Sequence, residues 1–423
     1  PGDLSAPELA ALLGSYRKRR RFHRLRSGAF VDVASMDLTL LERLSDDLGI
    51  SQKSLAAGTV ELPTYRAFYL DEEADLDRDR SFEAYVERLR APARDRYDAP
   101  PCVDGVLRPY QREGFAWLAA RTEAGFGAVL ADEMGLGKSV QLISLIAYRR
   151  QAYPAARPAL IVCPASLLYN WLAEFERFAP HLGVAIAHGP KADRLAVLRR
   201  AGGPQAPDVL VTSYDSLRAD SQDYERLDFD LCALDEAQHI KNPATLVARS
   251  CKRVQAACRV ALTGTPLENR LSDLWSLFDF LMPGLLGPYA GFRKRFEEPI
   301  VGGDEATAER LRQIVGPFIC RRSKKDVLTE LPDKCESVVY AQFDGEQRRL
   351  YDAHEQRLRE MLTVQKNESA SRGHRRGTGP KRSDGTREEP TRVEVLAELT
   401  KLRQLCCDPG LLYEDYRGAA AKV

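Results

Sequence analysis

Between residues 107 and 344, short apolar runs alternate with stretches of helical periodicity, and this alternation limits the folds open to the chain. A continuous apolar run that is too short for a helix is typical of a strand buried on both faces. Helices between such strands serve as the crossovers of a parallel sheet. The pattern therefore predicts an α/β fold with helices flanking a parallel sheet, whose strands we expect at 127–131, 159–163, 184–187, 208–212, 231–234 and 260–263.

Two helices of this region have clear signals. Residues 139–150 form the expected first crossover, with Leu142, Ile143 and Ile146 on one face. Residues 271–281 form the second, which Pro283-Gly284 ends. These long helical stretches predict helical insertions in the sheet domain.

The flanking regions differ in composition. Residues 1–100 begin with a helical stretch at 6–13, and Ser27-Gly28 then joins a basic run at 16–26 to a strand-like run at 29–33, a hairpin signal. Residues 345–423 are expected to form a helix at 346–364, a disordered basic insert at 371–391 and a helix at 391–405. We expect a small α+β accessory domain at 1–100, a lobe built on the parallel sheet with a helical protrusion at 101–344, and a helical linker at 345–423.

Charge and cysteine content narrow the class of protein. Lys and Arg total 62 and Asp and Glu total 61, so any nucleic-acid surface must be local. The basic run at 16–26 is either a phosphate-contacting strand or a solvated hairpin face. No apolar run approaches the roughly 20 residues that span a bilayer, and nine cysteines without a Cys-x-x-Cys pair indicate reduced thiols. We expect a cytoplasmic protein without a membrane partner and, because the chain starts at Pro1, an excised piece of a longer one.

The most specific local signal is the segment Leu130-Ala-Asp-Glu-Met-Gly-Leu-Gly-Lys-Ser139. Gly135 and Gly137 permit the backbone angles that turn amides toward an anion. Lys138 is expected to reach the β- and γ-phosphates of a nucleotide and Ser139 to ligate Mg²⁺. The segment departs from the strict phosphate-loop rule, because Asp132 stands where the first glycine belongs.

Two further segments follow apolar strands. Asp230-Leu-Cys-Ala-Leu-Asp-Glu-Ala-Gln-His239 places Asp235 and Glu236 at the carboxyl end of a strand, where an open parallel sheet binds its ligand. Asp235 is expected to hold Mg²⁺ and Glu236 to orient the attacking water. The segment Leu262-Thr-Gly-Thr-Pro266 ends the next strand with two hydroxyls beside a glycine, and we expect it to sense the nucleotide state.

Together these segments resemble the first lobe of Swi/Snf-type helicase-like ATPases of helicase superfamily two, bacterial members in particular, in which Asp at the first glycine position is usual. The resemblance covers about 105–423, and residues 1–100 loosely resemble an accessory region of bacterial members. It rests also on Arg108-Pro-Tyr-Gln111, Cys163-Pro-Ala-Ser-Leu-Leu-Tyr-Asn-Trp171, Thr212-Ser-Tyr214, Phe318-Ile-Cys-Arg-Arg-Ser-Lys-Lys-Asp-Val327 and Leu402-Arg-Gln-Leu-Cys-Cys-Asp-Pro-Gly410.

The resemblance implies a RecA-like fold, ATP and Mg²⁺ as ligands, and non-specific binding to the backbone of double-stranded DNA. Gln238 stands where the family has His. The implied ATP-binding residues are Arg108, Gln111, Asp132, Glu133, Met134, Gly135, Leu136, Gly137, Lys138 and Ser139, with Lys138, Asp235 and Glu236 catalytic and Ser139 and Asp235 on Mg²⁺. The implied coupling residues are Gln238, Thr263, Gly264 and Thr265, and the implied DNA contacts are Ser166, Asn170, Ser213, Tyr214 and Asn269.

The family has a second lobe whose arginine completes the ATP site, and that motif has no counterpart before Val423. We therefore expect the chain to be nearly inactive in hydrolysis, with Arg321 and Arg322 as the local substitutes for the arginine. The full protein is expected to be a nucleoid-associated translocase that remodels protein–DNA complexes, with RNA polymerase or another DNA-bound protein as candidate partner. A strand-separating helicase and a non-catalytic docking module are the alternatives.

Overall fold

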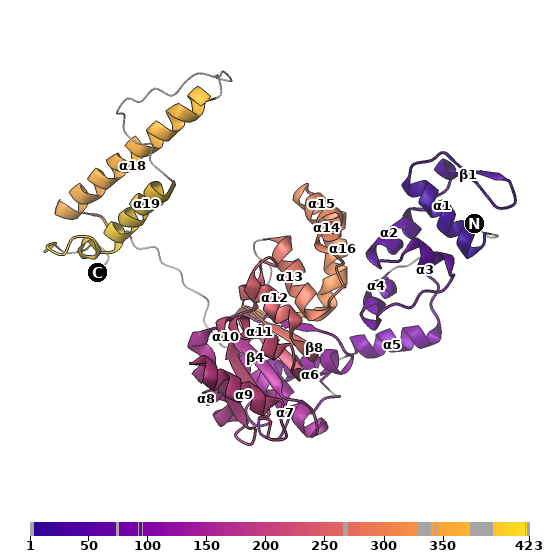
Figure 1. Ribbon diagram of the computed structural model, residues 1–423, viewed down its shortest axis with the longest axis horizontal. Helices are drawn as coiled ribbons and strands as arrows, with labels where there is room; N and C mark the ends of the chain where they lie inside the picture. Colours follow the sequence, from indigo (N-terminus) through magenta and orange to yellow (C-terminus); the bar gives the residue numbers. More distant parts are fainter. Residues whose placement is uncertain are drawn as a thin grey trace. The chain divides into compact units, whose positions relative to one another are not determined.

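The computed structural model describes residues 4–72, 76–91, 93–94, 96–264, 270–327, 340–343, 345–372, 392–418 and 420 (Figure 1). Contacts divide the chain into two compact units, Pro1–Leu331 and Pro332–Val423. The first 100 residues thus share a unit with the predicted lobe. Of the insert predicted at 371–391, the first two residues are helical and the remainder lies outside the described residues.

The predicted parallel sheet is confirmed. It has seven strands in the order β5-β6-β4-β7-β8-β3-β9, and each neighbouring pair is parallel. β9 was not predicted, because two residues are too few to give a pattern. The strands are β3 (Ala128–Leu130), β4 (Ala159–Cys163), β5 (Val184–Ala187), β6 (Val209–Ser213), β7 (Asp228–Leu234), β8 (Gln255–Leu262) and β9 (Ile319–Cys320).

Helices cover both faces of this sheet (Figure 1). Alternate residues of one strand enter different clusters, so that Leu160 packs on one face and Ile161 on the other. The helices of the lobe are α6 (Pro109–Glu123), α7 (Lys138–Ala152), α8 (Leu168–Phe178), α9 (Lys191–Ala201), α10 (Tyr214–Ala219), α11 (Ser221–Tyr224), α12 (Leu246–Arg253), α13 (Leu271–Leu281), α14 (Tyr289–Phe292), α15 (Glu298–Val301), α16 (Glu305–Val315) and α17 (Lys324–Val327).

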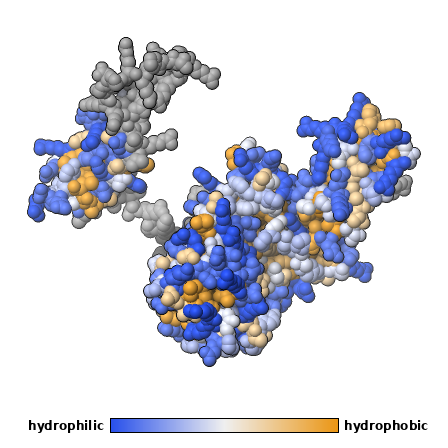
Figure 2. Space-filling view, in the orientation of Figure 1, coloured by the Kyte–Doolittle hydropathy of each residue, from blue (hydrophilic) through white to orange (hydrophobic). Residues whose placement is uncertain are grey.

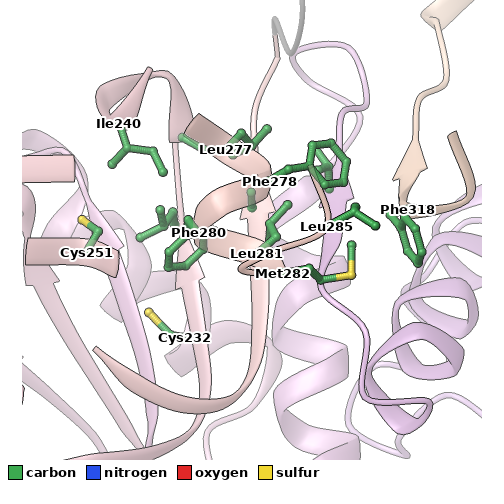
Figure 3. Close-up of a cluster of buried hydrophobic side chains, with 14 of the residues drawn as sticks. Cys232, Ile240, Cys251, Leu277, Phe278, Phe280, Leu281, Met282, Leu285 and Phe318 are labelled. Carbon is green, nitrogen blue, oxygen red and sulfur yellow. The ribbon is translucent and has the colours of Figure 1, made fainter. Parts of the chain in front are cut away.

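The predicted helix at 271–281 is α13, and it supplies much of one cluster. Figure 3 shows its side chains Leu277, Phe278, Phe280 and Leu281, all buried. α13 therefore closes the core on one side of the sheet.

At the surface, hydrophilic side chains dominate the visible face, with apolar colour confined to patches (Figure 2).

The N-terminal region contains the predicted hairpin. β1 and β2 pair antiparallel, and Gly28 in the turn has φ 89°, in the left-handed region that favours glycine. The elements are α1 (Ala6–Arg17), β1 (Phe22–Arg24), β2 (Phe30–Asp32), α2 (Thr39–Asp47), α3 (Gln52–Ala56), α4 (Ala67–Glu72) and α5 (Arg80–Arg90).

α4 inserts an aromatic side chain into the core of the lobe. The ring of Phe68 lies 6.1 Å from that of Phe126 and 5.6 Å from that of Phe318, both edge-to-face. All three side chains are buried. Asp47 of α2, also buried, accepts a hydrogen bond from Tyr69 at 2.6 Å and lies 3.5 Å from Arg310 of α16. The N-terminal helices and the lobe thus share a core.

In the second unit, α18 (Gly345–Arg372) packs against α19 (Arg392–Cys407). The side chain of Gln347 donates a hydrogen bond to the carbonyl of Leu405 at 2.8 Å, and His354 bonds to Glu398. Over the part of the chain that the structure describes, we find no helix with both the length and the apolar composition to cross a membrane.

Candidate nucleotide-binding site

The predicted phosphate loop connects β3 to α7. Gly135 and Gly137 have φ 88° and 74°, so both adopt the left-handed conformation expected of them. A Cβ on Gly137 would lie 2.5 Å from Nε2 of Gln111, so a side chain at this position would require Gln111 to move. Gly137 is also the N-cap of α7, whose first amides add positive potential beside the loop.

Lys138 is folded back over the loop. Its Nζ donates to the carbonyl of Asp132 at 2.8 Å and to that of Glu133 at 3.5 Å. Burial lowers the pKa of Lys138, and the carboxylates of Glu236, Asp132 and Asp235 act in the opposite direction. The ammonium group is therefore held between its own loop and the carboxylates of β7.

Asp132 explains why the first glycine of the strict phosphate-loop pattern is missing. Its carboxylate is fully buried and accepts from Arg322 Nε at 2.9 Å and from Gln141 Nε2 at 3.2 Å. Arg322 also donates to the side-chain carbonyl of Gln141 at 2.7 Å and to the backbone carbonyl of Tyr110. A side chain at this position anchors the loop, and the guanidinium of Arg322 is committed to that task.

Gln111 bridges the start of α6 and the loop. Its Nε2 donates to the carbonyl of Leu136 at 3.1 Å, and its Oε1 accepts from the amide of Arg108 at 2.9 Å. Arg108 is exposed at the N-cap of α6. The structure thus brings the two residues of the predicted adenine-sensing segment next to the phosphate loop.

Asp235 and Glu236 lie at the carboxyl end of β7, as predicted. Asp235 accepts from Trp171 Nε1 at 3.0 Å and from the amide of Glu236 at 3.0 Å. Burial raises the pKa of Asp235. Glu236 has φ 52°, an uncommon conformation for a residue with a side chain, and such strain clusters at functional sites.

A chain of side-chain hydrogen bonds leads from Glu236 to β8. Gln238 Nε2 donates to Glu236 Oε2 at 2.7 Å, and Thr263 Oγ1 donates to Gln238 Oε1 at 3.2 Å. Gln238 uses its side-chain amide as a donor and its side-chain carbonyl as an acceptor at once. The adjacent Gly264 approaches the loop so closely that an added Cβ would lie 2.9 Å from the Cγ of Met134.

Oxygen donors suited to Mg²⁺ gather where α7 begins. Burial and nearby Asp235 raise the pKa of Glu174, whereas the nearby Ser139 hydroxyl acts in the opposite direction. Mg²⁺ usually keeps several waters and takes few protein ligands, so this donor set fits the ion. Sequence reasoning missed Glu174, although its spacing of three from Trp171 on α8 places both residues on one helix face.

The predicted DNA contacts divide into three groups. Ser166 and Asn170 are exposed. Ser213 and Tyr214 are buried: Ser213 caps α10 through the amide of Ser216 at 3.2 Å, and the Tyr214 hydroxyl donates to the carbonyl of Asp235 at 2.7 Å. A buried side chain has to leave its internal partner before it can reach a phosphate, so DNA contacts at these two positions stay a prediction. Asn269, like Thr265, which is predicted to couple the site to motion, lies outside the described residues.

Comparisons with known proteins agree with this geometry. Residues 110–411 match the family described as SNF2-related domain, and residues 1–100 match the one described as bacterial SNF2 helicase associated. A putative ATP-dependent helicase/translocase of Bacillus subtilis, YwqA, is 38% identical over 281 residues, covering 66% of this chain and 30% of its own. The TATA-binding protein-associated factor mot1 of Schizosaccharomyces pombe is 31% identical over 407 residues, which cover 90% of this chain and 20% of that protein.

The solved structures agree as well. The SWI2/SNF2 ATPase core of Sulfolobus solfataricus in complex with dsDNA is 35% identical, with a TM-score of 0.51 over 77% of this chain and 62% of that one. The chain spans less than a third of the length of the curated relatives named above. The RecA-like sheet and the matched segments lead to one conclusion: the chain belongs to the SNF2 family of helicase-like ATPases.

Proposed function

We propose that the chain is the Mg-ATP-binding lobe of a DNA-dependent translocase that remodels protein–DNA complexes. The observation that carries this proposal is the hydrogen-bonded path from Glu236 through Gln238 to Thr263, beside a phosphate loop whose Lys138 faces the same carboxylates. We keep 1–100, 101–344 and 345–423 as its accessory, motor and linker regions, and expect it in the nucleoid of the cytoplasm.

The residues divide the work by position. Lys138 leaves the Asp132 carbonyl to bind the β- and γ-phosphates, and the amides of the loop, 133–139, bind the remaining phosphate oxygens. Gln111 and Arg108 lie where an adenine would be sensed. Ser139 and Asp235 would hold Mg²⁺, which when bound neutralises charge on the phosphates. Glu236 accepts a proton from the water that attacks the γ-phosphate, and Gln238 holds that carboxylate in place.

Coupling to motion follows from the same path. When the Glu236 carboxylate shifts on binding the attacking water, Gln238 shifts with it, and the acceptor that its side-chain carbonyl offers to Thr263 moves accordingly. Thr263, Gly264 and Thr265 thereby report the nucleotide state to the segment that follows β8.

Hydrolysis by this chain alone should be slow. The phosphoryl group that is transferred develops negative charge, which an arginine stabilises in related enzymes. Arg322, one local candidate, is held by Asp132 and Gln141. The family resemblance assigns the arginine to a second lobe.

Double-stranded DNA is the track that we propose, because the similar Sulfolobus core forms a complex with dsDNA. Ser166 and Asn170 are exposed hydrogen-bonding side chains suited to phosphate contacts without sequence readout. The name of the mot1 relatives, TATA-binding protein-associated factor, supports a DNA-bound protein as the target, and RNA polymerase is another candidate.

A strand-separating helicase is the second candidate, favoured by the word helicase in the name of the Bacillus relative. The deciding experiment uses the full-length protein and its Glu236→Gln variant. We expect ATP hydrolysis stimulated by duplex DNA more than by single strands or RNA, displacement of a triplex-forming strand, and no unwinding of a forked duplex. Unwinding that is lost with Glu236→Gln would favour the helicase, and hydrolysis independent of DNA would refute the proposed function.

A further inference from the structure

The hairpin β1–β2 has an outer face that nothing in the ATPase site uses. In its register Arg24 is paired with Phe30, and Phe22 lies two residues before Arg24, so the three side chains share one face. Phe22 is 54% exposed and Phe30 is 70% exposed. The opposite face is packed, since His23 bonds to Ser15 at 2.8 Å and Val31 packs on the N-terminal core. The exposure of the two phenylalanines is therefore a property of the folded hairpin.

Cations surround these rings. The guanidinium of Arg21 lies 5.3 Å from the centre of the Phe22 ring, and that of Arg24 lies 6.0 Å from the centre of the Phe30 ring. Over the described residues, none of the carboxylates forms an ion pair with Lys18, Arg19, Arg20, Arg21 or Arg24. In a chain of net charge +1, this gathering of unpaired cations requires segregation of charge.

The backbone fixes this arrangement. Arg19 has φ 52°, a conformation uncommon for a residue with a side chain, and its amide donates a hydrogen bond to the backbone carbonyl of Tyr16 at 2.8 Å. The amide of Arg20 donates to the carbonyl of Ser15 at 3.1 Å. These contacts turn the basic run from the end of α1 into β1, so that the cations border the aromatic face.

From this face we infer a second nucleic-acid site, in which Phe22 and Phe30 stack on unpaired bases of single-stranded DNA while the arginines bind its phosphates. Aromatic faces with basic surroundings are the means by which proteins hold single strands. A duplex keeps its base faces stacked internally and would leave both phenylalanines unused. An acidic protein surface would use the charge but offers no flat partner for the rings.

Arginine rather than lysine predominates here, and its planar fork matches a phosphate in two-pronged contacts. The one carboxylate of the strand pair, Asp32, already accepts from the amide of Ala34 at 3.0 Å. We commit to DNA because it is the nucleic acid on which the proposed function acts, and in this choice the inference rests on that function. This site lies outside the ATP-binding lobe and does not depend on hydrolysis.

The test is binding of a labelled oligothymidylate of about 16 nucleotides, within the range of known single-strand sites, to the whole chain without nucleotide. Stacking on each phenylalanine predicts a loss of roughly tenfold per ring removed. Phe22→Ala and Phe30→Ala should each weaken binding, and Phe22→Tyr and Phe30→Tyr should retain it. Tyr340→Ala, which removes an aromatic ring 88% exposed elsewhere, is the matched control and should have no effect.

A second readout separates stacking from charge. Quenching of 2-aminopurine in the oligonucleotide should disappear in the alanine variants and persist in the tyrosine variants. Arg24→Ala should instead lower the salt dependence of binding. Three results would each overturn the inference. The alanine variants could lose as much affinity for duplex DNA as for single-stranded DNA, or they could bind the oligothymidylate as tightly as the original chain does. The original chain could also bind oligouridylate more tightly than oligothymidylate.

Discussion

Arg322 and Asp132, which lie 190 positions apart in the sequence, form an ion pair that joins the segment after β9 to the first position of the phosphate loop. The backbone adds to this link, because the amide of Glu133 donates to the carbonyl of Arg322 at 3.0 Å. The amide of Lys324 in turn donates to Glu133 Oε2 at 2.8 Å. An ion pair, a backbone hydrogen bond and a bond to the Glu133 side chain therefore join the phosphate loop to the segment that follows β9.

Arg322→Ala should destabilise the chain by about 3–5 kcal/mol, because it leaves the buried Asp132 carboxylate without its counter-charge. Urea unfolding measures the change. In the double variant with Asp132→Ala, the loss should be clearly smaller than the sum of the single losses. Arg312→Ala, which breaks an exposed pair with Glu309, should change stability by at most about 1 kcal/mol. Additive losses for Asp132 and Arg322 would show that the pair is not coupled.

Lys138→Ala should weaken binding of ATP far more than binding of adenosine, because it removes a charge-assisted contact to phosphate. Calorimetric titration of both ligands gives the ratio. Lys191→Ala, an exposed lysine on α9, is the control and should bind both ligands unchanged. Equal ATP affinity in the Lys138 variant would refute the phosphate-loop assignment.

Gly137→Ala should destabilise the loop for two separable reasons. The left-handed backbone adds roughly 1–2 kcal/mol for any residue with a Cβ, and the new methyl group meets Nε2 of Gln111. A Gln111→Ala background removes the contact with Nε2 and leaves the backbone strain and a contact of 3.3 Å with Cγ1 of Val140, so the same substitution should then lower the melting temperature less. An equal drop of the melting temperature in both backgrounds would show that the Gln111 side chain moves aside without a cost in stability.

Single-turnover hydrolysis by this chain should be slower than by the full-length protein by about 10³–10⁵, the value of a stabilising arginine in related enzymes. Glu236→Gln should abolish what remains of the activity. Robust turnover by the chain that DNA stimulates and Glu236→Gln removes would mean that the lobe carries its own arginine.

Asp235→Asn should raise the melting temperature of the nucleotide-free chain at pH 7. Burial raises the pKa of Asp235 above its unfolded value, so the folded state binds more protons than the unfolded state between those two pKa values. The free energy of unfolding therefore falls as the pH rises through that window, and the ionised carboxylate destabilises the folded chain at neutral pH. The advantage of the asparagine variant should vanish as the pH drops toward the ordinary value of 3.8. A constant advantage at all pH values would contradict this account.

The sequence predicts the parts of the fold that depend on local pattern. The strands Ala159–Cys163 and Val184–Ala187 and the helix Leu271–Leu281 appear with the predicted bounds. β7 and β8 begin earlier than predicted, at Asp228 and Gln255, because pairing with neighbours extends a strand into polar residues. How far two strands pair depends on the tertiary structure, and the apolar pattern of one strand does not reveal it.

The site shows the same division. Lys138, Asp235 and Glu236 lie in motifs and were predicted, whereas the partner of Asp132 was not. Motif spacing does not show which distant side chain will fill a buried position. The internal partner of Tyr214 was not predicted for the same reason, since its hydroxyl meets the Asp235 carbonyl only after the sheet has brought β6 and β7 near each other.

The position of Phe68 bears on how such chains change over generations. A lobe encoded from residue 101 onward would present Phe126 and Phe318 to water where the Phe68 ring now lies. Recombination that exchanged the first 100 residues for an unrelated segment would need an incoming ring of the same size at the same place. The two regions therefore depend on each other for packing, and we expect substitutions at Phe68 to be accompanied by changes at Phe126 or Phe318 among related chains.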